Sequence, residues 1–156
     1  MSKLKIGDKA PEFLLEISQD KKVSLGDLKE KYIVLYFYPK DDTPGCTLEA
    51  IDFNELLNEF NTLNTVVLGI SRDDLKSHGK FKDKYNLKFN LGSDIDGQTC
   101  SKYSVWVEKS MYGKKYLGPL RAAYLFDGDG KLLAVIPKVE AAEHGSQVLA
   151  AIAALE

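Results

Sequence analysis

The feature that most constrains the fold is an uninterrupted apolar run from Tyr32 to Tyr38. It is rich in β-branched and aromatic residues and shows no polar alternation, so it predicts a strand with both faces buried. Pro39 ends the run because proline has no N–H to continue a strand ladder. A second apolar run, Thr65 to Ile70, follows after a segment with helical spacing. Two buried strands joined by a helix form a parallel pair, which places the chain in the α/β class.

The other elements follow from apolar spacing and from capping residues. Between the two strands the spacing predicts one helix from Thr43 to about Leu63, with Thr43 as its N-cap and Pro44 at the first helical position. The later elements we expect are a helix capped by Asp73 or Asp74 and ending near Tyr85, a short strand at Phe89 to Leu91, a short helix bearing Cys100, a hairpin of Arg121 to Phe126 with Lys131 to Ile136, and a helix from about Ala142 to Leu155. Together they predict a central mixed sheet flanked by helices on both faces.

Length and charge restrict the function. The 156 residues fit a single domain, 1–156, and 21 Lys plus Arg against 23 Asp plus Glu give a net charge of −2. That balance argues against a nucleic-acid-binding protein, which would show a basic excess. No apolar run approaches the roughly 18 residues of a membrane-spanning helix, and the first residues lack the apolar core of a signal peptide. We therefore expect a cytoplasmic protein with reduced thiols and no membrane partner.

The segment from Pro39 to Thr47 is the most informative about chemistry. It places Cys46 in the first turn of the predicted helix, at the end of a buried strand, where open α/β sheets carry their sites. The first-turn N–H groups have no partner within the helix and the dipole there is positive, so a thiolate at Cys46 is stabilised. The Thr43 hydroxyl can bond both the thiolate and a bound oxygen, and Gly45 allows close backbone approach. Position alone leaves a buried, inert Cys46 as the second interpretation.

The same residues resemble the active-site motif of the peroxiredoxins, Pro-x-x-x-Thr-x-x-Cys, with Pro39, Thr43 and Cys46 in its fixed places. The run from Tyr36 to Thr47 is similar to that of the Q subfamily, the bacterioferritin comigratory proteins. Further segments continue the match: Gly7 to Phe13 and Val105 to Gly118. The resemblance covers nearly the whole chain. It implies a thioredoxin-like fold and a thiol-dependent antioxidant peroxidase, which reduces hydrogen peroxide and organic hydroperoxides through a sulfenic acid and needs no cofactor or metal.

The resemblance also implies roles for single residues. Cys46 attacks the peroxide, and Arg121 falls where the family carries its catalytic arginine, a permanent cation that can hold both thiolate and peroxide. Three further residues complete and shield the cradle: Thr43, Gly45 and Pro39. Glu49 lies three residues after Cys46 on the same side of the predicted helix. We expect it to orient Arg121, with an exposed acid at the helix start as the alternative.

One departure from the subfamily concerns the second cysteine. Ile51 stands where many members carry a resolving cysteine, so that mechanism is absent. Cys100 is the only other thiol, and it could resolve the Cys46 sulfenic acid only if the two Cα atoms came within about 7 Å. The interpretation we favour is a core residue at Cys100 and a one-Cys enzyme. An external thiol would then recycle Cys46, from thioredoxin, glutaredoxin or a low-molecular-weight compound.

Other candidate residues are predicted to have structural roles. His78 and His144 lie in polar settings without a visible catalytic partner, and we expect both at the surface. The pair Asp41-Asp42 predicts a solvated loop rather than a metal site. Trp106 and Tyr112 are expected to pack in the core rather than to border the entrance of the active site.

Two functional hypotheses remain open. The first is a peroxidase, which by resemblance would be a monomer. The second is a redox relay or sensor, in which Cys46 is oxidised and passes the oxidation to a partner protein without turnover. Both need a reactive Cys46, and only the first needs a recycling reductant. A thioredoxin-type disulfide reductase is disfavoured because the chain has no Cys-x-x-Cys motif.

Overall fold

The computed structural model of the chain describes residues 4–28, 30–103, 106–111, 114–119, 122–137 and 140–156, with 106–111, 114–119 and Pro137 described by their backbone alone. In chain order the elements are β1 (Leu14–Ser18), β2 (Lys21–Ser24), the 3-10 turn η1 (Leu25–Asp27), β3 (Tyr32–Phe37), α1 (Pro44–Glu55), α2 (Leu57–Thr62), β4 (Thr65–Ser71), α3 (Leu75–Tyr85), β5 (Asn90–Ser93), α4 (Gln98–Lys102), β6 (Trp106–Met111), β7 (Lys114–Pro119), β8 (Ala122–Asp127), β9 (Leu132–Pro137), the 3-10 turn η2 (Ala141–Glu143) and α5 (His144–Ala153). Within the described residues, no helix combines the length and the apolar character that a membrane span requires.

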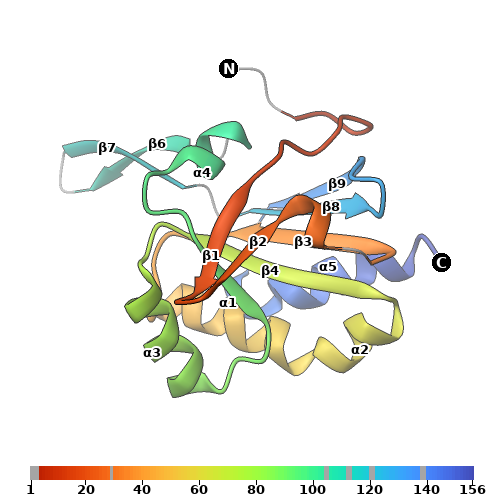
Figure 1. The fold of residues 1–156 in the computed structure, drawn as a ribbon, viewed down its shortest axis with the longest axis horizontal. Coiled ribbons are helices and arrows are strands. Elements are labelled where there is room, and N and C mark those ends of the chain that lie inside the picture. The colour runs from red at the N-terminus through yellow and green to blue at the C-terminus, as the bar shows by residue number, and fades with distance from the viewer. Residues whose placement is uncertain (1–3, 29, 104–105, 112–113, 120–121, 138–139) are drawn as a thin grey trace.

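A mixed sheet of seven strands forms the centre of the molecule (Figure 1). Its strand order is β2-β1-β5-β4-β3-β8-β9, and β6 pairs with β7 in a separate antiparallel ribbon. β3 lies parallel to β4, with Tyr32 opposite Thr65, and antiparallel to β8, with Tyr32 opposite Asp127. All six residues of β3 are buried. The expected central strand, parallel pair and C-terminal hairpin are therefore confirmed.

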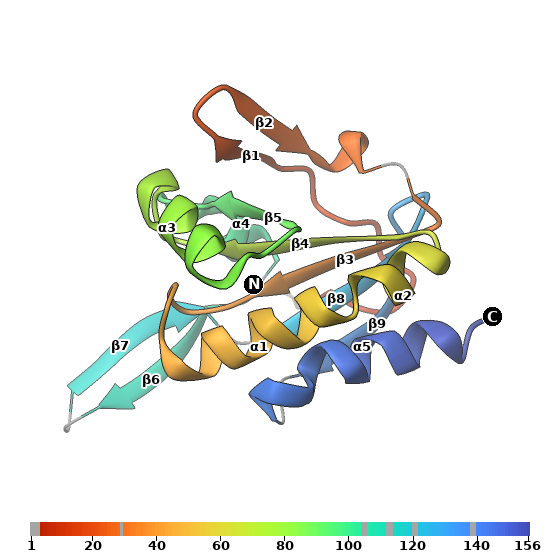
Figure 2. The ribbon, with the colours of Figure 1, turned by 90° about the horizontal axis from the view of Figure 1, so that it is seen from below.

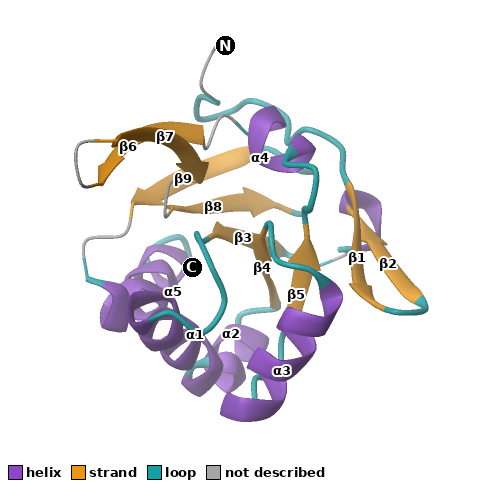
Figure 3. Ribbon diagram, turned by 90° about the vertical axis from the view of Figure 1, so that its left-hand side faces the viewer, coloured by secondary structure: helices purple, strands orange, loops and turns teal. Residues whose placement is uncertain are grey.

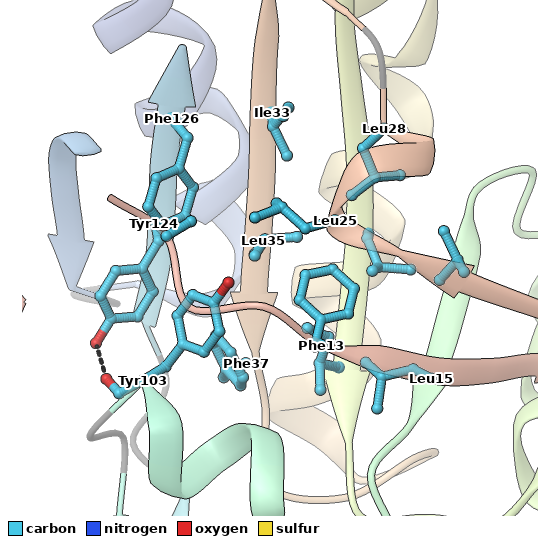
Figure 4. Packing of buried hydrophobic residues seen from close by; sticks show 14 of the residues in the cluster. Phe13, Leu15, Leu25, Leu28, Ile33, Leu35, Phe37, Tyr103, Tyr124 and Phe126 are labelled. Carbon is cyan, nitrogen blue, oxygen red and sulfur yellow. Dashed lines mark hydrogen bonds between the residues drawn. The ribbon is translucent and has the colours of Figure 1, made fainter. Parts of the chain in front are cut away.

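Successive side chains of β3 point to opposite faces of the sheet, so the strand contributes to two hydrophobic cores. Ile33 and Leu35 belong to the core that Figure 4 shows, in which Phe13 and Tyr103 pack over the sheet. Val34 and its alternate neighbours belong to the core on the other face, beneath the long helices. The sheet thus separates the interior into two layers of apolar side chains.

The helices are divided unequally between the two faces (Figure 3). α1, α2, α3 and α5 lie on one face, and α1 runs beside α5 (Figure 2). The other face is covered by the short helix α4, the turn η1 and the chain before β1. Helices on both faces are confirmed, although the second face carries only short ones in the described part of the chain.

Two elements differ from the expectation. The helix predicted from Thr43 to Leu63 is two helices, because Leu56 leaves the helical geometry with φ −98° and ψ 6°. The apolar stripe continues through both helices, so spacing alone could not reveal the break. The ribbon of β6 and β7 was not expected at all, since its residues mix charged, polar and apolar types without a buried-strand run.

Candidate active site

Cys46 lies in the first turn of α1, directly after the loop that leaves the central strand β3. Its side chain is buried, with 1% of the residue exposed, and it packs in the core beneath the long helices. Pro44 occupies the first turn, where its missing N–H costs no hydrogen bond. The sheet and the helix start therefore place a cysteine sulfur where the first-turn amides of a helix favour an anion.

Thr43 is the N-cap of α1, as expected, but its side chain does not cap the helix. Its backbone is extended, and its Oγ1 donates to the Lys40 carbonyl oxygen at 2.9 Å. That bond bends the loop back on itself just before Cys46. Pro39 and Gly45 are half-buried in the same loop and first turn. The three predicted residues Pro39, Thr43 and Gly45 thus lie in one short segment directly before the thiol.

A buried network holds this loop against α3. The Asp41 carboxylate, on a residue 7% exposed, accepts hydrogen bonds from Tyr38 Oη at 2.6 Å and from Ser77 Oγ at 2.8 Å. It also lies 2.6 Å from His78 Nδ1, and Asp41 N donates to Asp73 Oδ2 at 2.8 Å. Burial raises the pKa of Tyr38 well above its ordinary value, so its hydroxyl remains a donor.

These contacts overturn two expectations. His78 is 1% exposed and bonded through both ring nitrogens, the second to the Gly92 carbonyl oxygen at 3.2 Å. Asp41 is buried, so only Asp42 lies in the solvated loop that was predicted for both. No local pattern indicates this arrangement, because Asp41 and His78 are 37 residues apart.

Asp42 makes a second, exposed tie from the loop to α3. It adopts the left-handed region with φ 57°, and its carboxylate accepts from Lys84 Nζ and from Tyr85 Oη, each at 2.8 Å. The hydrogen bond from Lys84 holds the pKa of Asp42 below its ordinary value, with Tyr85 adding to the effect. A surface hollow of about 520 Å³ opens between α1 and α3 here, and its lining is Asp42, Pro44, Thr47, Leu48, Lys84 and Tyr85.

Glu49 follows Cys46 by one helical turn and is fully buried, so the alternative of an exposed acid is wrong. Its Oε2 lies 2.5 Å from Nδ1 of His144, the first residue of α5. His144 is also fully buried, which overturns the expectation that it lies at the surface. Its Nε2 lies 2.9 Å from the Ile136 carbonyl oxygen in β9. Sequence reasoning missed this pair because the two residues are 95 positions apart.

Three side chains with predicted roles, one in the active site and two in the core, lie outside what the structure describes. Arg121 and Tyr112 are not among the described residues, and of Trp106 only the backbone is described. The roles expected for their side chains stay predictions.

Cys100 lies on the opposite face of the sheet from Cys46. It is fully buried in α4 and packs in the core with Ile33 and Leu35, whereas Cys46 packs with Val34. Burial raises the pKa of the Cys100 thiol strongly, and a hydrogen bond with the Asp94 carboxylate adds to the shift. The two cysteines are not joined in a disulfide, and the central strands lie between them.

One group of side chains in the described part of the chain has the composition of a metal site. The ligand atoms of Asp41, Asp73 and His78 lie within 4.8 Å of one another. Protein donors already engage them, since Ser71 Oγ donates to Asp73 at 2.7 Å and Tyr38 donates to Asp41. The group is explained as a hydrogen-bond network that fixes the loop.

Comparison with known proteins agrees with this geometry. A model of the AhpC/TSA family matches residues 6–135. Peroxiredoxin Bcp of Bacillus subtilis is 43% identical over 146 residues, which are 94% of this chain and 93% of that protein. A structure of the Xanthomonas campestris bacterioferritin comigratory protein, described for its alkyl peroxide reduction activity, has a TM-score of 0.85 at 41% identity, over 92% of this chain and 91% of that one. A cysteine-to-serine mutant of Xylella fastidiosa PrxQ has a TM-score of 0.91 at 35% identity, over 99% of each chain.

The sheet, the helix and the buried cysteine at its start define a thiol-dependent peroxidase of thioredoxin-like fold, and the chain belongs to the AhpC/TSA family, the peroxiredoxins. Within that family it is of the Bcp, or Q, type. The resemblance found in the sequence and the fold that it implied are both confirmed.

Proposed function

We propose that this chain, acting as a single domain of residues 1–156, reduces hydrogen peroxide and organic hydroperoxides through Cys46. The observation that carries the proposal is the placement of the Cys46 sulfur in the first turn of α1, after the Thr43 N-cap and at the end of β3. A first helical turn favours the thiolate, which is the nucleophilic form of cysteine. The activity described for the Xanthomonas campestris relative supports the same chemistry.

The reaction has two stages. The Cys46 thiolate attacks one peroxide oxygen, so that an S–O bond forms while the O–O bond breaks, and Cys46 becomes a sulfenic acid. The leaving alkoxide or hydroxide takes up a proton and departs as alcohol or water. A reductant thiol then displaces the sulfenic oxygen as water and forms a mixed disulfide. A second thiol attacks that disulfide and releases reduced Cys46.

The neighbouring residues have supporting roles in this proposal. The amides of the first turn, at Gly45 and Cys46, are donors for the developing negative charge. The Thr43 hydroxyl becomes a third donor once it turns away from the Lys40 carbonyl oxygen, to which it donates in the structure. Arg121 supplies a permanent positive charge, as the family pattern implies, and Glu49 orients it. The half-buried Pro39 excludes water from the thiol.

We propose a one-Cys mechanism, because the sheet stands between the two thiols. A disulfide needs the two Cα atoms within about 7 Å, and Cys100 packs against the face of β3 opposite to Cys46. For Cys100 to resolve the sulfenic acid, α4 would have to leave its core and pass around the sheet. An external thiol is therefore the reductant in this proposal: thioredoxin, glutaredoxin or a small thiol, acting on a monomer in the reducing cytoplasm.

Intact mass tests both the reaction and the mechanism. The wild type, Cys46→Ser and Cys100→Ser are treated with one equivalent of hydrogen peroxide without reductant. We expect a gain of about 16 Da in the wild type and in Cys100→Ser, but not in Cys46→Ser. A loss of about 2 Da that needs both cysteines would replace the one-Cys mechanism with an intramolecular disulfide. An unchanged wild type would overturn the proposed function.

A second assay separates the peroxidase from a relay or sensor. Peroxide consumption is followed with each candidate reductant system in excess over the protein. The peroxidase consumes many equivalents of peroxide per Cys46 with at least one of them. A relay without turnover stops after one equivalent under every condition.

A further inference from the structure

Three consecutive residues at the start of α5 dock onto α1 just beyond Cys46. His144 reaches Glu49, and Ser146 donates to the Asp52 carboxylate from its backbone N at 2.7 Å and from its Oγ at 3.1 Å. Gly145 lies between them, where a Cβ atom would stand 2.9 Å from the Phe53 backbone N. A side chain at Gly145 would therefore force α5 away from α1. This docking brings the imidazole of His144 to the turn that follows the reactive thiol.

The hydrogen-bond geometry fixes the proton count of the Glu49–His144 pair. The Ile136 carbonyl oxygen can only accept, so His144 Nε2 carries a hydrogen. Nδ1 faces the Glu49 carboxylate, so one proton lies between Nδ1 and Oε2. Whichever atom holds it, the pair as a whole is neutral. His144 thus compensates a carboxylate whose side chain is fully buried.

Compensation matters because of where Glu49 lies. Cys46 and Glu49 are three residues apart on α1 and share one side of the helix. An unbalanced negative charge on a buried carboxylate would repel a thiolate one turn away and oppose its formation. Such a carboxylate would also be costly to bury, so it would protonate or turn toward another group. The proton shared with His144 balances the charge of Glu49, and the contact holds Oε2 of the carboxylate in place.

We propose that His144 is a positioning residue for the reaction at Cys46 and acts through Glu49. Its second bond, to β9, fixes the imidazole from the side opposite to α1. The Phe53 ring packs edge-on against it, with centroids 5.8 Å apart. The imidazole therefore has one orientation, and its contact with Oε2 fixes the orientation of the Glu49 carboxylate. This inference rests on the proposed function, because it concerns the rate at which Cys46 reacts with peroxide.

The test is a double-mutant cycle on the rate constant of Cys46 oxidation by hydrogen peroxide, read by quenched-flow mass spectrometry. Single variants are His144→Leu and Glu49→Gln, and the third carries both changes. A small displacement at a reacting centre can lower the reaction rate about 100-fold. We therefore expect His144→Leu to slow the oxidation of Cys46 about 10- to 100-fold. When His144→Leu is added to Glu49→Gln, the rate constant should fall by less than about twofold, because the carboxylate through which His144 acts is already absent. Losses that simply multiply would overturn the inference.

Two further variants separate positioning from stability. Val148→Ala shortens a fully buried side chain of the same helix. It should lower the Tm while leaving the oxidation rate within about twofold of wild type. His144→Asn places a neutral donor near the position of Nδ1, so it should recover part of the rate if His144→Leu folds poorly. A rate that follows Tm across all variants would contradict a positioning role.

The ultraviolet absorbance of the thiolate gives an independent readout, corrected by the matching Cys46→Ser variants. His144→Leu should lower the thiolate fraction at neutral pH, and Val148→Ala should not. If Cys46 of the wild type does not react with peroxide, the proposed function itself is contradicted. If the wild type reacts and His144→Leu reacts equally fast, only the inference about His144 is contradicted.

Discussion

At the residue scale, two buried histidines hold acidic side chains on either side of Cys46 in the chain. His78 meets Asp41 in the loop before the cysteine, and His144 meets Glu49 in the turn after it. The sequence contains no other histidine, so both histidines of the protein serve the segment around one thiol. Both pairs are buried away from water. Removing one partner of a pair therefore leaves the other as a buried polar group without compensation.

Removing the Asp41 carboxylate should therefore be costly. Asp41→Ala leaves His78 and the Tyr38 hydroxyl buried without their acceptor. We expect the free energy of unfolding to fall by about 3–5 kcal/mol, measured by urea denaturation. Asp42→Ala is the matched control on the neighbouring residue, whose partners Lys84 and Tyr85 can turn to water. Equal losses for the two variants would contradict the buried network.

The Cys100 thiol should resist alkylation in the native protein. Cys100 is buried and its pKa is raised by burial, so in the native protein it should stay unmodified by iodoacetamide at mildly alkaline pH. In denaturant it should react like an ordinary cysteine. Peptide mapping of Cys46→Ser before and after unfolding reports Cys100 alone. Rapid native modification of Cys100 would show that α4 opens readily, which the two-Cys alternative needs.

At the scale of elements, the contact of α5 with α1 depends on one glycine. Gly145→Ala would place a Cβ atom 2.9 Å from the Phe53 N and 3.1 Å from its Cα, and backbone atoms cannot turn aside. We expect a loss of about 1–3 kcal/mol in the free energy of unfolding, seen in urea melts.

Gly79→Ala is the matched control for that change. Gly79 lies in the interior of α3, and nothing stands within 4 Å of its added Cβ. Alanine there should stabilise the protein by about 0.5–1 kcal/mol, because glycine is a poor helix former. Two variants that both stabilise would show that α5 has room to shift on α1.

The elements also show what a sequence can reveal. Strong local patterns were enough to predict β3 and the hairpin of β8 and β9. They limited the cap of α3 to Asp73 or Asp74, and the structure shows that it is Asp74. The motif around Cys46 was enough for the family. The break at Leu56 was missed because the apolar spacing continues across it. The ribbon of β6 and β7 was missed because its residues show no regular apolar spacing. The buried histidines were missed for another reason, since their polar neighbours in sequence suggest a surface while their partners come from distant elements.

At the scale of the whole molecule, Glu156 ties the end of the described chain to the start of the central strand. Its carboxylate accepts from Lys31 Nζ at 2.9 Å and from Tyr32 Oη at 2.8 Å. The Lys31 hydrogen bond holds the pKa of Glu156 below its ordinary value. The tie therefore stabilises the fold above the ordinary pKa of glutamate, and this contribution is lost as the pH falls through the lowered one.

Carboxyl-carbon NMR titration of Glu156 checks this tie. Lys31→Ala should bring the pKa of Glu156 back up toward its ordinary value. The same variant should leave the lowered pKa of Asp42 unchanged, because that shift depends on Lys84. A Glu156 pKa that does not respond to Lys31→Ala would mean that the ion pair does not persist in solution.

The docking of α5 on α1 has a consequence for biosynthesis. Glu49 is translated 95 residues before His144, and β8, which flanks β3, is also made late. While the ribosome adds those residues, the nascent segment around Cys46 has β4 within reach but neither β8 nor His144. The thiol thus passes through synthesis without one strand and one histidine that lie near it in the folded protein. Under the proposed role of His144, the Cys46 thiol of an unfinished chain should react with peroxide more slowly than the thiol of the folded protein.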